Sequence, residues 1–127
     1  MLKQRPAGDK SWPVACSQTT LGEDGEELDL SEAHLSYGDF KDATFQATGA
    51  IKLNGTGLAH ADLSDSMLTA SLSNGKALID FTAANLTSAD LSGSKITARG
   101  SYYGPSTIDF TEATLAKADL SQWLGAH

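Results

Sequence analysis

The sequence predicts an all-β solenoid, in which the chain winds into stacked laps, and three patterns lead to this fold class. An apolar residue returns every five positions in four runs, which begin at Leu28, Ile51, Ile79 and Ile108. Two of the runs are nearly identical, with the sequences IDFTAANLTSADLS and IDFTEATLAKADLS. On a helix a period of five scatters apolar side chains about 140° apart around the axis, and on a flat strand it alternates them between faces. The backbone must therefore turn once in every repeat.

The third pattern is the register of the insertions between runs. Four repeats of five make a lap of twenty residues, whereas successive runs start 23, 28 and 29 residues apart. Placed at the end of each run, the surplus forms segments 46–50, 69–78 and 97–107. All three leave the lap at the same corner, as expected of stacked, equivalent laps. We therefore expect three aligned loops inserted at one corner.

Each lap is predicted to have four sides, and the central residue of each side is expected to point inside. Over successive laps these residues would form four columns: Leu30, Leu53, Phe81 and Phe110; Leu35, Leu58, Leu86 and Leu115; Phe40, Leu63, Leu91 and Leu120; Phe45, Leu68 and Ile96. Two positions earlier, the second to fourth sides carry mostly alanine or serine. On the first side the same position holds the leucine or isoleucine that opens each run. These larger side chains are expected to fill a corner widened by the loops, because interiors tolerate few voids.

The groups AHADLSDS, AANLTSADLSGS and ATLAKADLSQ resemble the repeats of the pentapeptide-repeat family, whose pattern is A(D/N)LXX. The resemblance covers roughly residues 28–124. It implies a right-handed parallel quadrilateral β-helix with four five-residue sides per coil, and about four coils in this chain. The inserted loops and the isoleucine-rich first side depart from the family pattern, so a smooth prism is not expected along that edge.

The repeats divide the chain into an N-terminal cap or extension, residues 1–27, and a β-helix domain, residues 28–127. A stack of coils has two open ends, where apolar columns and unpaired backbone groups need covering. Residues 1–27 are the candidates at the first end. At the other end, Trp123 and Leu124 are predicted to cap the last coil or to form a homodimer contact. A third interpretation, that the chain is a fragment of a longer one, stays open.

One outward column consists of carboxylates, one on the third side of each lap: Asp39, Asp62, Asp90 and Asp119. At the spacing of about 4.8 Å between paired chains, these groups would repel one another unless hydrated or paired. One interpretation is a cation site or a mimic of nucleic-acid phosphates. The interpretation we favour is that aspartate suits a turn-rich repeat, because its carboxylate accepts local backbone hydrogen bonds. No His or Cys spacing in the sequence is typical of a metal site, so no metal and no cofactor are expected.

The wall made by the three aligned loops is the strongest candidate for a binding surface, because insertions in repeat proteins collect on one face. The third loop carries Arg99, Tyr102 and Tyr103. Exposed arginine and tyrosine side chains are frequent anchors of protein interfaces. The two tyrosines could instead fold back over the widened corner as a lid, and both interpretations stay open.

The net charge of −7 is unevenly distributed. Residues 21–32 carry six acids and no base, whereas the chain from Ala33 onward has nine acids and six bases. This mild acidity argues against direct binding to nucleic acid or to an anionic membrane, which calls for clustered Lys and Arg. It is also low for a mimic of duplex DNA, since a body about 20 Å tall would need roughly twelve net charges.

We therefore expect a small, non-catalytic protein-interaction module, either a monomer or a homodimer through the C-terminal end, and the family resemblance implies that it is of bacterial type. The family resemblance implies two alternatives, a DNA-mimicking modulator of gyrase or topoisomerase and a targeting or substrate-binding domain of a larger translocated effector. The lone cysteine, Cys16, fits a reducing compartment. The sequence has neither a signal-peptide pattern nor an apolar stretch of about 20 residues. A cytoplasmic protein is expected, or one delivered to a host cell by a non-classical route.

Overall fold

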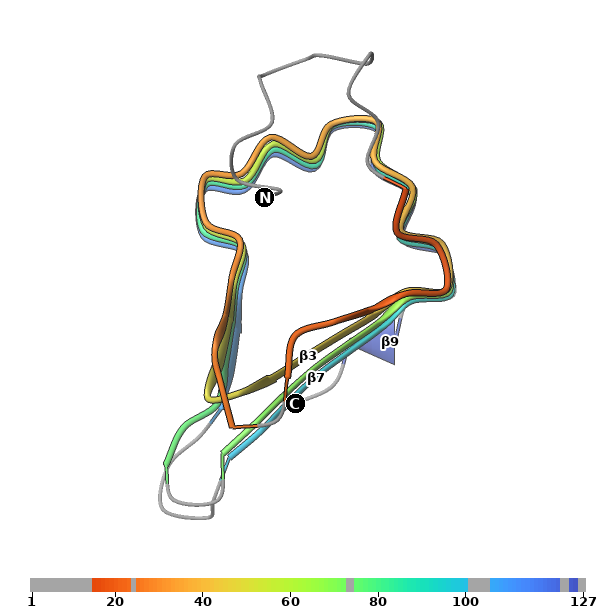
Figure 1. Cartoon of the computed structure of the whole chain (residues 1–127). Helices are drawn as coiled ribbons and strands as arrows, with labels where there is room; N and C mark the ends of the chain where they lie inside the picture. Colours follow the sequence, from red (N-terminus) through yellow and green to blue (C-terminus); the bar gives the residue numbers. More distant parts are fainter. Residues whose placement is uncertain (1–14, 24, 73–74, 101–105, 122–123, 126–127) are drawn as a thin grey trace.

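The computed structural model describes residues 15–23, 25–72, 75–100, 106–121 and 124–125. Over these ranges the chain is all-β and contains no helix. Its strands form two sheets, and every strand pair in both sheets is parallel. The all-β class is therefore confirmed, and successive laps lie one behind another along the stack (Figure 1).

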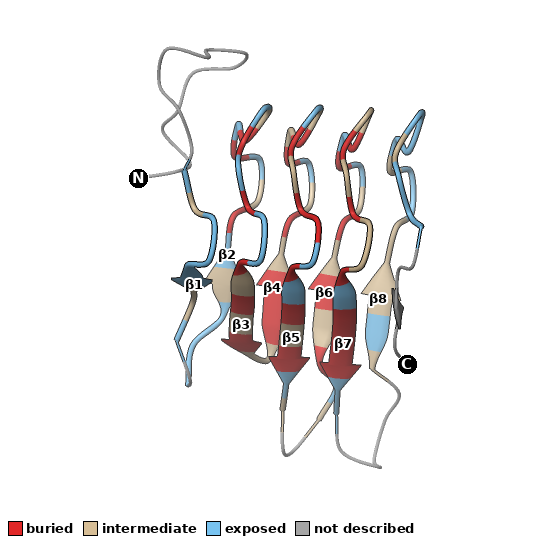
Figure 2. Ribbon diagram, turned by 90° about the vertical axis from the view of Figure 1, so that its right-hand side faces the viewer, coloured by how far each residue is buried: buried red, intermediate tan, exposed pale blue. Residues whose placement is uncertain are grey.

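Each lap contributes one strand to each sheet, so the two sheets take alternate strands along the chain (Figure 2). The five-stranded sheet has the order β1 (Thr20–Leu21), β3 (Thr44–Thr48), β5 (Met67–Ser71), β7 (Lys95–Arg99) and β9 (Leu124–Gly125). The four-stranded sheet has the order β2 (Leu28–Asp29), β4 (Ala50–Lys52), β6 (Leu78–Asp80) and β8 (Thr107–Asp109). The strands of the first sheet lie on the predicted fourth side of the lap, and those of the second on the first side.

The second and third sides are short, and each is joined to the next lap by a single bridge between tight turns. One column of bridges joins His34, Gly57, Asn85 and Thr114, and the other joins Ala15, Asp39, Asp62, Asp90 and Asp119. The first column advances by 23, 28 and 29 residues per lap, the spacings found in the sequence. Equivalent positions of successive laps therefore stack, as the repeat predicts.

Three corners of the lap are tight turns whose second residue has a positive φ. The non-glycine residues in this conformation are Gln18, Glu32, Tyr37, Asp42, His60, Asp65, Ala83, Ser88, Glu112 and Lys117. The left-handed conformation costs such a residue about 1–2 kcal/mol. Hydrogen bonds between laps offset this cost: the Tyr37 N–H donates to the Ala59 carbonyl at 2.9 Å, and the His60 N–H to the Thr87 carbonyl at 2.8 Å.

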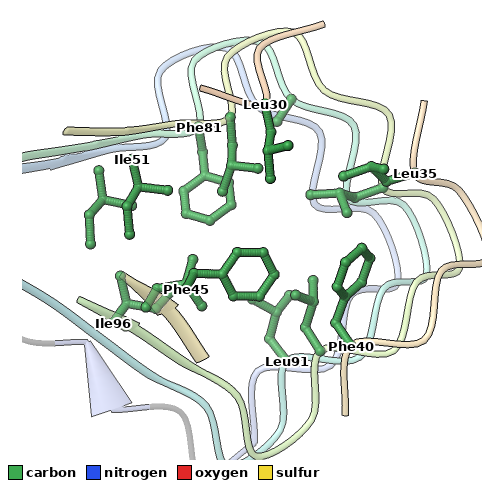
Figure 3. Packing of buried hydrophobic residues seen from close by; sticks show 14 of the residues in the cluster. Leu30, Leu35, Phe40, Phe45, Ile51, Phe81, Leu91 and Ile96 are labelled. Carbon is green, nitrogen blue, oxygen red and sulfur yellow. The ribbon is translucent and has the colours of Figure 1, made fainter. Parts of the chain in front are cut away.

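The core is the stack of central side chains predicted from the period of five. In the first three laps all of them are 7% exposed or less: Leu30, Leu35, Phe40, Phe45, Leu53, Leu58, Leu63, Leu68, Phe81, Leu86, Leu91 and Ile96. The labelled side chains in Figure 3 converge from all four sides of the lap. Small residues such as Ala33, Ala84 and Ala89 are buried two positions earlier, as expected. In the fourth lap the columns reach the end of the stack, where Leu115 and Leu120 are 37% and 38% exposed.

The corner expected to carry three loops is built differently from the prediction. The first three residues of each predicted insertion, 46–48, 69–71 and 97–99, continue the strand of the fourth side. They pair in register from lap to lap, so the surplus lengthens this side and the true loops are shorter. The lengthened fourth side and the first side converge, and the lap tapers there (Figure 1). Buried residues of both sheets fill the taper: Ala47, Ile51, Ala70, Ile79 and Ala98.

Residues 15–21 already belong to the stack, ahead of the first predicted run. Ala15 bridges Asp39, the Cys16 N–H donates to the Asp39 carbonyl at 2.7 Å, and β1 pairs with β3. The side chains of Cys16 and Leu21 are partly buried against the core. About half a lap therefore precedes Leu28. Residues 1–14 of the expected cap lie outside the described residues.

Candidate functional site

The predicted loop corner is the place where the two sheets converge, and we call its described residues, 46–51, 69–72, 75–79, 97–100 and 106–108, the wedge. The strands β5 and β7, whose last three residues lie in the wedge, pair along their whole length, and the Leu72 N–H then donates to the Arg99 carbonyl at 2.9 Å. The inner side chains Ala70 and Ala98 are buried, and Leu72 packs against the core. The loops thus stand on a base that is hydrogen-bonded between laps and apolar inside.

Further hydrogen bonds between laps fix the residues that follow the loops and lead into the first side. The Thr107 N–H donates to the Ala77 carbonyl at 3.0 Å, and the Ala77 N–H donates to the Ser106 hydroxyl at 3.2 Å. The laps approach closely at Gly100, where a Cβ would lie 2.5 Å from both the Gly75 carbonyl oxygen and the Ser106 hydroxyl. Any side chain at position 100 would therefore push the neighbouring laps apart.

Of the three predicted interface anchors, the structure describes Arg99. This residue ends β7 with an exposed side chain and pairs with Ser71 of the preceding lap. Because side chains alternate along a strand, Arg99 points to the same outer face as Lys95 and Thr97. On that face Lys95 and Arg99 are exposed, whereas Thr97 is only 5% exposed. Tyr102 and Tyr103 lie outside the described residues, so their role as interface or lid stays a prediction.

The aspartates of the third side stand in register on successive laps, where the bridges join them one to the next. The Asp62 carboxylate accepts the Ser64 N–H at 3.0 Å and the Ser64 hydroxyl at 2.6 Å. Asp90 accepts the same two groups of Ser92, at 2.9 Å and 2.6 Å. One oxygen of each carboxylate is therefore engaged in the turn that follows it.

The same local hydrogen bond recurs on other sides of the lap. Asp29, Asp80, Asn85 and Asp109 each accept the N–H of the residue two positions on. This arrangement ties a side-chain oxygen to the backbone of a turn. Because it appears at several corners, the third-side aspartates have a role in the turns that needs no ligand.

Two carboxylates near the C-terminal end of the stack, those of Asp109 and Asp119, have lowered pKa values. The hydroxyl and N–H of Thr111 lower the pKa of Asp109. The N–H and hydroxyl of Ser121 likewise lower the pKa of Asp119. Both shifts arise because these donors stabilise the charged carboxylate.

The described residues contain no group of three or more His, Cys, Asp or Glu that could hold a metal ion. Cys16 is a poor nucleophile in its setting, since burial and, to a lesser degree, the Asp39 carboxylate raise the pKa of its thiol. A thiol with a raised pKa stays protonated at neutral pH.

The C-terminal end of the stack is only partly described. Leu124 lies in β9, where its backbone is opposite Lys95 of β7, so the fourth lap continues into its fourth side. Trp123 lies outside the described residues. The expected cap or dimer contact at Trp123 and Leu124 therefore stays a prediction.

Sequence reasoning missed two surface features. Tyr37 and His60 stack at a corner, with ring centroids 4.8 Å apart and ring planes at 7°, and Tyr37 is 45% exposed. The signal was their separation of 23 residues, one lap. The lengthened strands were also missed, although TFQAT, MLTAS and KITAR each place apolar residues at their second and fourth positions.

No protein-family model matches this chain, and no curated protein is similar enough in sequence to count as a relative. Within the part of the chain that the structure describes, there is no helix of the length and apolarity needed to cross a membrane.

Proposed function

We propose that this protein is a non-catalytic protein-interaction module, built on a right-handed quadrilateral β-helix like that of the pentapeptide-repeat family, and that it binds its partner through the wedge. The fold part of the proposal is supported by the five-residue period, the in-register stacking of laps and the two parallel sheets with two bridged sides between them.

One observation carries the functional part. In the wedge successive laps have more residues than the five-residue repeat requires, and these extra residues occur at the same corner in each lap and pair in register. The second and third sides close with five residues each, so the stack itself does not require the extra pairs of β5 and β7. These pairs end in the exposed Ser71 and Arg99, above buried Ala70 and Ala98. Side chains held on such a fixed base lose less entropy on binding.

Site-specific crosslinking in the cells that make the protein tests this function. A photoreactive amino acid at Ser71 should capture one reproducible protein, because this position lies on the outer face of the wedge. The matched control is the same amino acid at Ala116, which is exposed on the second side. The proposal fails if Ser71 yields no specific product or the same products as Ala116.

The two tyrosines of the third loop are tested separately. If they are interface anchors, Tyr102→Ala/Tyr103→Ala should abolish capture at Ser71 without changing the melting temperature. A large fall in melting temperature would identify them as a lid instead.

A second candidate, a DNA-mimicking modulator of gyrase or topoisomerase, is favoured by the in-register carboxylates of the third side. Their local hydrogen bonds and the nearby Lys41, whose ammonium lies 3.8 Å from the Asp65 carboxylate, weigh against it. A gyrase supercoiling assay decides: inhibition by the wild type that is lost in Asp62→Asn/Asp90→Asn would support this candidate, and no inhibition at micromolar protein would remove it.

A further inference from the structure

Acidic residues are absent from one part of the solenoid. From residue 28 onward the chain has eleven acids, and none lies in the sequence segments 43–51, 66–79 and 94–108, from which the fourth side and the wedge of the first three laps are built. The same segments carry three bases, Lys76, Lys95 and Arg99. The rest of this part of the chain holds all eleven acids and only three bases. From residue 28 onward, an acidic chain thus has its one basic region here.

The turn chemistry accounts for the missing acids but not for the bases. Aspartates such as Asp62 and Asp90 precede turns whose N–H groups they accept. On the fourth side the chain continues as a strand, so an aspartate at the equivalent positions, Thr44, Met67 and Lys95, would have no such turn to bond. A neutral residue would serve equally well there, as Thr44 shows.

The three bases are also without the ion pairs found elsewhere. Lys52 lies 3.2 Å from the Glu27 carboxylate and Lys41 lies 3.8 Å from that of Asp65. Among the described residues, no carboxylate pairs with any of Lys76, Lys95 and Arg99, and all three are exposed. Because these side chains are exposed, a partner can reach their charges.

We call the outer face of β5 and β7 the basic face: Met67, Thr69, Ser71, Lys95, Thr97 and Arg99. Its ends are exposed, whereas Thr97 at its centre is only 5% exposed. Lys95 and Arg99 stand at its two ends, about 13 Å apart along β7. Met67 is opposite Lys95 on β5 and is 45% exposed. Methionine and arginine are both enriched at protein interfaces, and methionine adapts to irregular partners.

The basic face is confined to the second and third laps. At the first lap the acidic segment before β2 covers the corner, where the Gly25 N–H donates to the Thr48 hydroxyl at 2.7 Å and the Thr48 N–H to the Glu26 carbonyl at 2.8 Å. The acids of this segment therefore border the basic face on one side only.

Resting on the proposed function, we infer that the partner of the wedge is a protein with an acidic surface, whose carboxylates pair with Lys95, Arg99 and Lys76 and which makes an apolar contact with Met67 beside Lys95. Complementary charge of this kind steers association and fixes orientation. Nucleic acid fits poorly, because affinity for a duplex comes from roughly 6–10 phosphate contacts and the remaining sides are acidic. The acidic sides would likewise repel an anionic membrane.

The test measures binding of a fluorescent random copolymer of glutamate and tyrosine, which supplies carboxylates and aromatic rings, by anisotropy at physiological ionic strength. Lys95→Glu/Arg99→Glu should bind at least about tenfold more weakly than the wild type. The matched control, Lys41→Glu/Lys117→Glu, has the same net charge as Lys95→Glu/Arg99→Glu, but its substitutions lie on the acidic sides. Its affinity for the copolymer should stay within about twofold of the wild-type affinity. Melting curves verify folding, and Lys95→Gln/Arg99→Gln replaces the reversed variant if that one does not fold.

Three results would overturn the inference: no binding by the wild type, equal loss in both variants, or tighter Lys95- and Arg99-dependent binding to duplex DNA or phosphatidylserine vesicles than to the copolymer. The crosslinking experiment separates this failure from failure of the proposed function. If Ser71 still captures its partner after Lys95→Glu/Arg99→Glu, the wedge is an interface but its partner is not recognised by charge. If Ser71 captures nothing specific, the proposed function itself is wrong.

Discussion

The sides of each lap are held together in two different ways. The second and third sides have one bridge per lap and depend on turns, with left-handed residues and carboxylates that bond the turn backbone. The first and fourth sides are continuous sheets, with strands of two or three residues on the first side and of up to five on the fourth. On the first side the turn bonds start only at the last residue of a strand, as at Asp80. Both kinds of side contribute to one core. The sheet sides can therefore lengthen outward, whereas the turn sides stay at five residues.

This difference separates the places where the chain can vary. A turn side has its corner positions fixed by φ and by hydrogen bonds to the neighbouring laps. A sheet side needs only pairing in register and an alternation of inner and outer residues. The wedge lies at the junction of two sheet sides, and its outer positions are therefore free to carry the charges and loops that would bind a partner.

The largest expected effect tests whether both kinds of side depend equally on the shared core. Phe81→Ala, on the first side, should lower the free energy of unfolding by about 3–5 kcal/mol, and Leu86→Ala, on the second side of the same lap, by about 2–5 kcal/mol. Both side chains are at most 1% exposed. Chemical denaturation measures the two values. A Leu86→Ala cost below about 1 kcal/mol would show that the turn sides do not rely on the core.

A smaller effect is expected from exchanging residues at one corner of the turn sides. Gly55 and Ala83 occupy equivalent positions with φ of 67° and 57°. Gly55→Ala should cost about 1 kcal/mol, because alanine disfavours this conformation, and its Cβ would lie 3.2 Å from the Glu32 side chain. Ala83→Gly should gain about 0.5 kcal/mol, since relief of strain exceeds the added chain entropy. The denaturation midpoint should therefore shift down in Gly55→Ala and up in Ala83→Gly, relative to the wild type. A lower midpoint in both variants would argue against strain at the corner.

The smallest effect concerns pH. Because the folded-state pKa values of Asp109 and Asp119 are lowered from 3.8, these groups stabilise the fold above that pH. Their contribution should fall away as the pH drops from about 3.8 through the lower folded-state values. NMR titration of the two carboxylates would measure the pKa values directly. Asp119→Asn keeps the acceptor oxygen but does not titrate, so its stability should vary less with acid than that of the wild type. An unchanged acid dependence would exclude this role.

The candidate site was only partly predictable. Arg99 was expected at an exposed corner, and the structure describes it there. The basic face was not foreseen, because residues 97–99 were assigned to a loop, and Lys95 and Met67 gain their relation to Arg99 only when β5 and β7 pair in register. An alternation over five residues is too short to distinguish a strand extension from the start of a loop.

What the sequence alone determined was the lap: its length, the columns inside it and the corner where it lengthens. These features follow from the local sequence. Because the chain turns once in every five residues, the apolar residue that recurs at that period is the one that points inside. The tertiary structure decided how far each strand runs, where the first half-lap begins, and which outer side chains become neighbours. Those features depend on backbone pairing between residues one lap apart, such as Ala15 with Asp39 and Ser71 with Arg99, which are 24 and 28 positions apart in the chain. Pairing over such separations arises only when the laps stack, since no single lap contains both partners.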